Sequence, residues 1–159
     1  MSRFIPKMLP YDCIRNDNAF TFTTISGSEY EIYFTPGEDY LPGVIFAPFT
    51  RVFGFRQLKP AIRKSFDPRI SATVIQVVLD YFTDKRNVML YVCDQSDKRE
   101  RYRDKLFRLW YKIFGSDYSI IKKDIQAEET LFITIVYHAD NPFRTEIEAS
   151  LPDLENKWT

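Results

Sequence analysis

Residues 67–93, DPRISATVIQVVLDYFTDKRNVMLYVC, decide the fold because they predict a helix followed by a buried strand. Asp67 can accept hydrogen bonds from the free amides of a helix start, and Pro68 suits the first helical turn. Apolar residues then recur at helical spacing until about Asp84. Val88–Cys93 is an unbroken apolar run, which is typical of a central strand covered on both faces.

Upstream of this stretch, the sequence predicts three strands. Phe20–Ile25 and Tyr30–Phe34 alternate in polarity and flank a glycine-containing turn, which indicates a hairpin. A longer strand is expected over Val44–Phe55, where Pro48 indicates an edge position or a bulge. Arg51 is the exception on the apolar face of this strand.

Downstream, the pattern predicts one more helix and two more strands. The helix is expected over residues 96–114 and ends at Gly115. Residues 118–124 and 129–137 have the pattern of an antiparallel pair. The tail, residues 141–159, is expected to be helical or irregular.

The predicted element order is β-β-β-α-β-α-β-β. This order predicts an α+β fold, in which two main helices pack on a mixed, mostly antiparallel sheet. The helix between the third and fourth strands allows one parallel pair with a right-handed crossover. We expect a single domain over residues 1–159, in which residues 1–19 form an irregular N-terminal arm.

Composition narrows the class of protein. The 159 residues carry 22 basic and 22 acidic side chains, which disfavours a globally basic nucleic-acid binder. The N-terminal residues lack the apolar core of a secretory signal, and no apolar run has the length of a membrane span. Two distant cysteines, Cys13 and Cys93, predict neither a disulfide framework nor a zinc site. We therefore expect a cytoplasmic protein in which Cys93 packs in the core.

Charge is distributed unevenly along the chain. Residues 51–123 carry seventeen basic and eight acidic side chains, whereas both ends of the chain are acidic. The basic residues that could hold an anion are Arg63, Lys64, Arg69, Arg99 and Arg103. Such a surface would bind an acidic protein or an anionic ligand. The alternative is a solvated helix face that the acidic ends of the chain neutralise.

Residues 110–115, WYKIFG, end the second predicted helix with a Tyr-x-x-x-Gly spacing. Together with the predicted element order, this motif resembles the GNAT-type N-acetyltransferases without their first strand and first two helices. The resemblance implies an acyl-coenzyme A donor, a cleft between splayed strands beside Arg63–Arg69, and Tyr111 as the acid that protonates the coenzyme A thiolate. The alternative is aromatic core packing followed by a glycine C-cap.

The turn before the first predicted helix departs from that family. GNAT-type enzymes resemble one another in a glycine-containing turn whose open backbone amides bind the pyrophosphate. Residues 63–70, RKSFDPRI, contain no glycine. Pro68 has no amide hydrogen, and Asp67 places a negative charge where phosphate would lie. Binding in that manner is therefore opposed, although Arg63, Lys64 and Arg69 could act as side-chain ligands.

A second resemblance covers nearly the whole chain. It rests on Asp67-Pro68-Arg69-Ile70 leading to Tyr81-Phe82, on Leu90–Asp94, on Arg103–Trp110 and on Asn141-Pro142. In these motifs the chain is similar to a family of small bacterial proteins of unknown function. This resemblance implies no activity and no catalytic residue.

Three functions remain open. We favour a non-enzymatic binding or regulatory module of GNAT-like topology, with a basic surface and no cofactor, because the phosphate turn is missing. The alternative is an acyltransferase that uses acyl-coenzyme A. Nucleic-acid binding by the second helix is disfavoured because Tyr102 lies on its core stripe. His138, the only histidine, is interpreted as a turn residue, and no metal-ligand spacing is recognisable.

Overall fold

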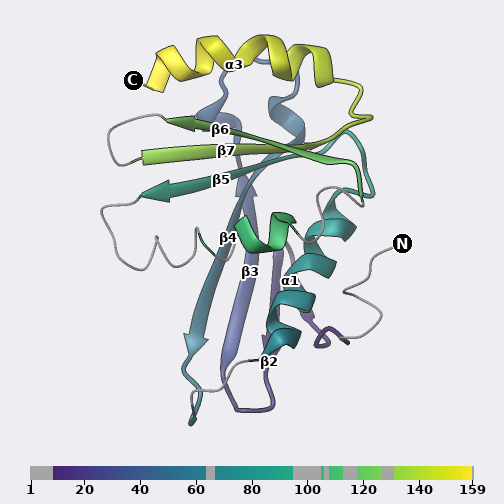
Figure 1. Cartoon of the computed structure of the whole chain (residues 1–159), viewed down its shortest axis with the longest axis vertical. Helices are drawn as coiled ribbons and strands as arrows, with labels where there is room; N and C mark the ends of the chain where they lie inside the picture. Colours follow the sequence, from purple (N-terminus) through teal and green to yellow (C-terminus); the bar gives the residue numbers. More distant parts are fainter. Residues whose placement is uncertain are drawn as a thin grey trace.

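The computed structural model describes residues 9–63, 67–94, 105, 108–112, 118–126 and 131–158. Within them, one sheet of seven strands has the order β1-β2-β3-β4-β5-β7-β6 (Figure 1). The strands are β1 (Ile14–Asn16), β2 (Ala19–Thr23), β3 (Glu29–Pro36), β4 (Thr50–Lys59), β5 (Val88–Asp94), β6 (Ile120–Gln126) and β7 (Leu131–His138). The helices are α1 (Pro68–Tyr81) and α3 (Arg144–Trp158), with 3-10 helices at Glu38–Tyr40 and Ala47–Phe49. The described residues between 105 and 112 are also helical.

The predicted α+β fold is confirmed. Strands β4 and β5 form one parallel pair, and the other neighbouring strands of the sheet pair antiparallel. The parallel pair is the one expected from the strand-helix-strand unit around α1, since such a pair needs a crossover connection. The antiparallel pairing of β2 with β3 and of β6 with β7 is also as predicted.

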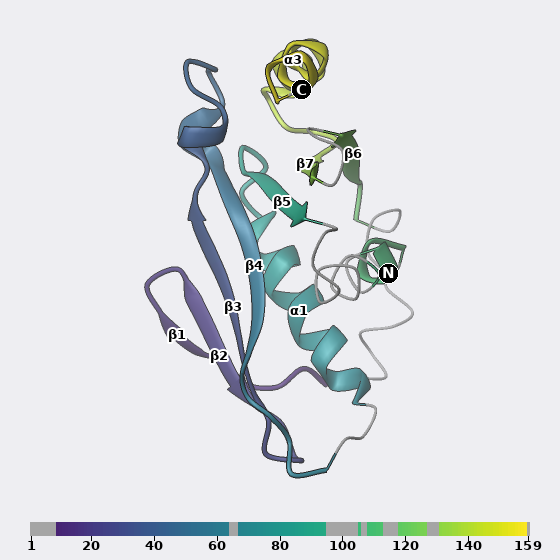
Figure 2. The same cartoon turned by 90° about the vertical axis from the view of Figure 1, so that its left-hand side faces the viewer.

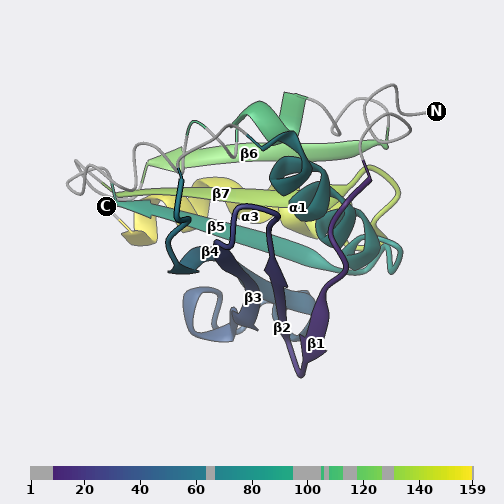
Figure 3. The ribbon, with the colours of Figure 1, turned by 90° about the horizontal axis from the view of Figure 1, so that it is seen from below.

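The sheet separates two apolar cores. One core contains Val74 and Val78 of α1 together with Met89 of β5. The other contains Leu90 of β5 and Ile147 of α3. In Figure 1, α3 lies above β5, β6 and β7 and α1 lies below them, and in Figure 3 α1 is in front of these strands with α3 behind. Strand β5 is therefore covered on both faces, as its unbroken apolar sequence predicts.

Helix α1 begins as its sequence predicts and ends three residues earlier than expected. The Asp67 side chain accepts a hydrogen bond from the amide of Arg69, and Pro68 is the first helical residue. The helix stops at Tyr81, whose carbonyl accepts the Asn87 side-chain amide at 2.7 Å. Figure 2 shows α1 running along one side of β2–β4.

Strand β4 is shifted along the sequence relative to the prediction over Val44–Phe55. Pro48 lies in the 3-10 helix Ala47–Phe49, and the Thr50 hydroxyl closes that turn by donating to the Phe46 carbonyl at 2.9 Å. The strand then continues to Lys59, because residues 51–59 pair with β3. The prediction of a strand before Pro48 was wrong, since proline has no amide hydrogen and favours the 3-10 turn.

The N-terminal part of the chain contains a short strand that the sequence pattern does not predict, and the C-terminal tail forms a helix. Strand β1 lies inside residues 1–19, which the sequence predicts to be irregular, and its three residues are too few to show alternation. Asp17 has a φ of 54° in the tight turn that joins β1 to β2. In the tail, α3 is one helix that contains Pro152. Of the described helices, none has the length and apolar character needed to cross a membrane.

Candidate ligand-binding cleft

Strands β4 and β5 begin as a pair and then separate. Their parallel register runs only from Thr50 opposite Val88 to Val52 opposite Leu90. Beyond it, β4 continues beside β3 and β5 continues beside β7. In Figure 1, β4 runs down the molecule whereas β5 runs across it. Among the described residues, no strand pairs with the β5-facing edge of β4 after Val52.

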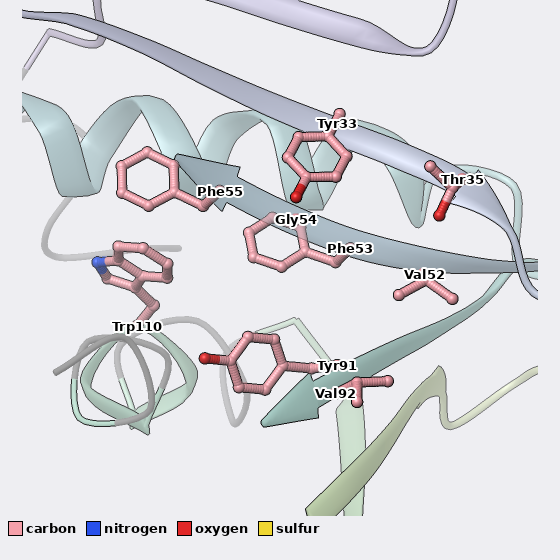
Figure 4. Close-up of a pocket in the computed structure, with 9 residues that line it drawn as sticks. All are labelled: Tyr33, Thr35, Val52, Phe53, Gly54, Phe55, Tyr91, Val92 and Trp110. Carbon is pink, nitrogen blue, oxygen red and sulfur yellow. The ribbon is translucent and has the colours of Figure 1, made fainter. Parts of the chain in front are cut away.

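A cavity of about 260 Å³ occupies this opening (Figure 4). Its lining includes Val52 and Gly54, and also Phe53 and Phe55, all from β4. Neighbouring residues of a strand point to opposite faces of the sheet. A cavity that touches both sets therefore lies in the plane of the sheet, where another strand would otherwise pair.

One wall of the cleft depends on a glycine. The Tyr33 ring lies so close to Gly54 that a Cβ at Gly54 would be 2.1 Å from the Tyr33 Cζ. The Arg56 guanidinium lies 5.1 Å from the centre of the Tyr33 ring and forms an ion pair with Glu31 at 2.6 Å. The ring is thus held between Gly54 and Arg56, and it lines the cleft.

Trp110 lines the cleft from the helical segment that follows β5. Its indole Nε1 donates to the Ser71 hydroxyl at 2.9 Å, which ties this segment to α1. The indole also makes an edge contact with Phe55, with ring centres 5.5 Å apart, and its side chain is buried. In Figure 4, the Tyr91 ring points from β5 toward Trp110. The cleft is therefore lined mainly by aromatic rings whose positions are set by packing.

The N-terminus of α1 is closed by the chain itself. One carboxylate oxygen of Asp67 accepts the amide of Arg69 at 3.0 Å, and the other accepts the Tyr11 hydroxyl. The Tyr11 amide in turn donates to the Thr73 hydroxyl at 2.8 Å. Burial raises the pKa of Tyr11, and the hydrogen bond to Asp67 raises it further. The carboxylate at this helix end is thus fully used inside the protein.

Arg69, a predicted anion ligand, is used in the same contact. Its Nε donates to the Leu9 carbonyl at 2.7 Å and a terminal nitrogen donates to the Pro10 carbonyl at 3.5 Å. The guanidinium carbon lies 3.9 Å from the centre of the Tyr11 ring. Arg69 therefore holds residues 9–11 against the start of α1.

The other predicted anion ligands do not form a site within the described residues. Arg63 is exposed, and neither it nor Arg69 lines the cleft. Lys64, Arg99 and Arg103 lie outside the described residues. The anion-binding role of these side chains stays a prediction, whereas the role of Arg69 in the fold is directly visible.

Tyr111, the predicted general acid, does not line the cleft. Its hydroxyl donates to the Ile120 carbonyl of β6 at 3.0 Å, and the Lys122 ammonium lies 5.7 Å from the ring centre. This contact fits the alternative of aromatic packing at the end of a helix. Gly115, the other residue of the motif, lies outside the described residues, as does the side chain of Cys93.

The last candidates for a chemical role are the single histidine and any cluster of metal-binding side chains. His138, interpreted as a turn residue, is the last residue of β7, and its Nδ1 accepts the Asp140 amide of the following turn at 2.9 Å. In the part of the chain that the structure describes, no group of three or more His, Cys, Asp or Glu residues could hold a metal ion.

The cleft residues are not evident from the sequence pattern. The sequence pattern places Tyr91 and Trp110 in the core and does not single out Tyr33, and only their three-dimensional positions bring the three to one opening. One signal was present: Gly54 is an isolated glycine inside a strand, which often marks a close approach of another group.

The comparisons with known proteins identify a family and no activity. A family model, described as a family of unknown function (DUF6169), matches residues 66–152, which is more than half of the chain. The match includes α1 and β5–β7 and excludes β1–β4. No curated protein and no solved structure matches the chain. The chain therefore belongs to DUF6169, a family of unknown function.

Proposed function

We propose that the protein is a non-enzymatic binding module that holds an extended peptide segment of a partner in the cleft between β4 and β5. The observation that carries this proposal is the separation of the two strands after Val52. A strand edge of this kind presents backbone donors and acceptors at a regular spacing, and extended peptides bind such edges by adding a strand.

The lining of the cleft supports an extended ligand. Aromatic rings of Tyr33, Phe55 and Trp110 surround the opening and offer contact area for side chains. The volume of about 260 Å³ is slightly below the usual range for small-molecule pockets, about 300–1,000 Å³. A narrow cleft that opens along a strand edge suits a slim chain better than a bulky compact ligand.

The start of α1 supports binding without acyl transfer. The GNAT resemblance would place a donor diphosphate on open amides there, but Pro68 has none and the Asp67 carboxylate holds the Arg69 amide and the Tyr11 hydroxyl. A diphosphate would meet this negative charge at close range. Tyr111 is hydrogen bonded to a β6 carbonyl rather than aimed into the cleft.

An acyltransferase is the second candidate, and one observation favours it. The GNAT resemblance implies a cleft between splayed strands, and β4 and β5 do separate after three residue pairs. The pantetheine arm of an acyl-coenzyme A donor is also slim and rich in amides. We also propose GNAT-like topology, a single domain and a cytoplasmic location, which both candidate functions share. The basic partner-binding surface belongs to the binding module alone.

The experiment selects random peptides of about seven residues, the length of the open β4 edge, on the full-length protein. Thr35 is exposed and lines the cleft, so Thr35→Trp should fill it, whereas Thr23→Trp, at an exposed position of β2 outside the cleft, is the matched control. Both sites are in strands, where tryptophan is tolerated. We expect selected peptides to lose affinity about tenfold or more with Thr35→Trp and to bind the control normally.

Two results contradict the proposal. One is that the selection yields no peptide, or only peptides whose affinity is the same for both variants. The other is acetyl transfer from acetyl-coenzyme A to an amine by the wild-type protein, which would establish the acyltransferase instead.

A further inference from the structure

A second cavity, of about 350 Å³, lies at the C-terminal end of α1, and its lining includes charged side chains, of which Arg51 and Asp80 have no ion pair within the described residues. Its walls come from β1, β2, β3 and the start of β4 on one side, and from the end of α1 and the following turn on the other. It shares no lining residue with the β4–β5 cleft. We call it the α1 C-terminal hollow.

Arg51 is the most unusual residue of this hollow. It shares a face of β4 with Phe53 and Phe55, where the sequence pattern expects an apolar side chain. Arg51 is half-buried, and among the described residues its guanidinium has no ion pair and no hydrogen bond. Removing a charge from water without a partner is unfavourable. An anion in the hollow would offset that cost.

A second arginine faces the same space. Arg15 on β1 also lines the hollow, and its guanidinium carbon lies 5.5 Å from the centre of the Phe20 ring. Its Nε donates weakly to the Asp17 carbonyl at 3.4 Å, and no carboxylate of the described chain pairs with it. The sheet side of the hollow thus presents two guanidinium groups, the side chains best suited to binding a carboxylate.

The opposite wall is acidic. Asp84 is already held by Arg86, with contacts of 3.0 and 2.8 Å. Within the described residues, the Asp80 carboxylate accepts only from the neutral Gln76 side-chain amide, at 3.0 Å. The C-terminal end of α1 adds the negative end of the helix dipole to this wall. The hollow is therefore positive on the sheet side and negative on the helix side.

Apolar side chains complete the lining. Phe20 and Phe34 face the hollow and touch in an edge contact, with ring centres 6.4 Å apart. Val77 of α1 also lines it. Tyr81 lines it too, but its hydroxyl donates to the Val88 carbonyl at 2.7 Å and is not available to a ligand as a donor.

We propose that the α1 C-terminal hollow binds a small zwitterion of the amino-acid class with an apolar side chain. The ligand carboxylate binds Arg51 and Arg15, and the ligand ammonium binds Asp80. The apolar side chain packs against Phe20 and Phe34. A cavity of about 350 Å³ is at the small end of ligand pockets, which suits a single amino acid rather than a nucleotide.

The test is calorimetric titration of the full chain with L-phenylalanine, and with its two single-charge analogues, 3-phenylpropanoate and 2-phenylethylamine. We expect saturable binding of L-phenylalanine, and binding at least about tenfold weaker for each analogue, because each lacks one charge. We expect Arg51→Gln and Asp80→Asn each to weaken binding of the amino acid about tenfold or more. Arg56→Gln, on the same strand but outside the hollow, should bind as the wild type does.

Arg15→Gln keeps the test valid if Arg51→Gln fails to fold, because Arg15 is exposed on a short edge strand. The proposal is overturned if L-phenylalanine and L-leucine both show no binding at about 10 mM, the limit of weak specific affinity. It is equally overturned if 3-phenylpropanoate binds as tightly as L-phenylalanine, or if Arg56→Gln weakens binding as much as Arg51→Gln.

Discussion

The two ends of α1 handle charge in opposite ways. At the N-terminal end, Asp67 and Arg69 are both engaged by residues 9–11. At the C-terminal end, Arg51 and Asp80 face a hollow without a charged partner in the described chain. The clustered basic residues of the sequence favour the N-terminal end as the anion site. A cationic cluster is available to a ligand only where the protein leaves its charges unsatisfied.

The largest expected effect is the loss of the N-terminal closure. Asp67→Ala removes the helix cap and the acceptor of the Tyr11 hydroxyl, so we expect a loss of about 2 kcal/mol in the free energy of unfolding. Urea denaturation followed by circular dichroism measures it. Asp80→Ala, at the other end of the same helix, is the matched control and should change the stability by less than about 0.5 kcal/mol. Equal losses for the two variants would contradict the comparison.

The second effect concerns Arg69, at the N-terminal end of α1. Arg69→Ala removes two hydrogen bonds to carbonyls and the contact with the Tyr11 ring, so we expect a loss of about 1–2 kcal/mol. Limited proteolysis provides an independent measurement, since residues 9–11 should be cut faster in Arg69→Ala than in the wild type. An unchanged cleavage rate would show that Arg69 does not hold this segment.

The third effect is a pH dependence that both ends share. Burial raises the pKa of Tyr81 and of Tyr11 above their ordinary value in the unfolded chain. Their contribution to stability is therefore complete below about pH 10 and is lost as the pH rises through the higher pKa of the folded state. We expect the free energy of unfolding to fall above about pH 10, with a shallower fall for Tyr81→Phe. Tyr40→Phe, at an exposed position, is the control, and an unchanged slope for Tyr81→Phe would rule out this origin.

The smallest effect is expected at the C-terminal end of α1, where Arg51 lines the hollow. Arg51→Gln removes a half-buried charge without a partner in the described chain, so the stability should change by less than about 0.5 kcal/mol or increase slightly. Thermal unfolding without ligand measures this change. A loss as large as that of Arg69→Ala would mean that Arg51 stabilises the fold and is not held for a ligand.

Local signals in the sequence predict much of this fold. Asp67 and Pro68 mark the start of α1, and the apolar run at Val88–Cys93 predicts a strand with two covered faces. Both features depend on residues close together in sequence. Strand β1 was missed because three residues cannot establish a period, and β4 was displaced because Pro48 favours a turn over a strand.

The candidate sites are harder to predict because they depend on distant contacts. The Tyr11 hydroxyl reaches Asp67 across 56 positions of sequence, so the closed end of α1 has no local signature. Tyr33 and Trp110 are likewise distant in sequence, and they line one cleft because β4 and β5 separate after Val52. Arg51 did stand out as an arginine on an apolar face, but the pattern alone does not show what surrounds it.

The contacts of Asp67 with the Arg69 amide and the Tyr11 hydroxyl predict that the start of α1 does not bind the diphosphate of an acyl-coenzyme A donor. The most direct measurement follows the backbone amide signals of Arg69 and Ile70 by NMR while acetyl-coenzyme A is added to millimolar concentration. The closure by Asp67 and Tyr11 predicts no saturable change in either signal. A saturable shift of both amides, with the fold intact, would contradict it.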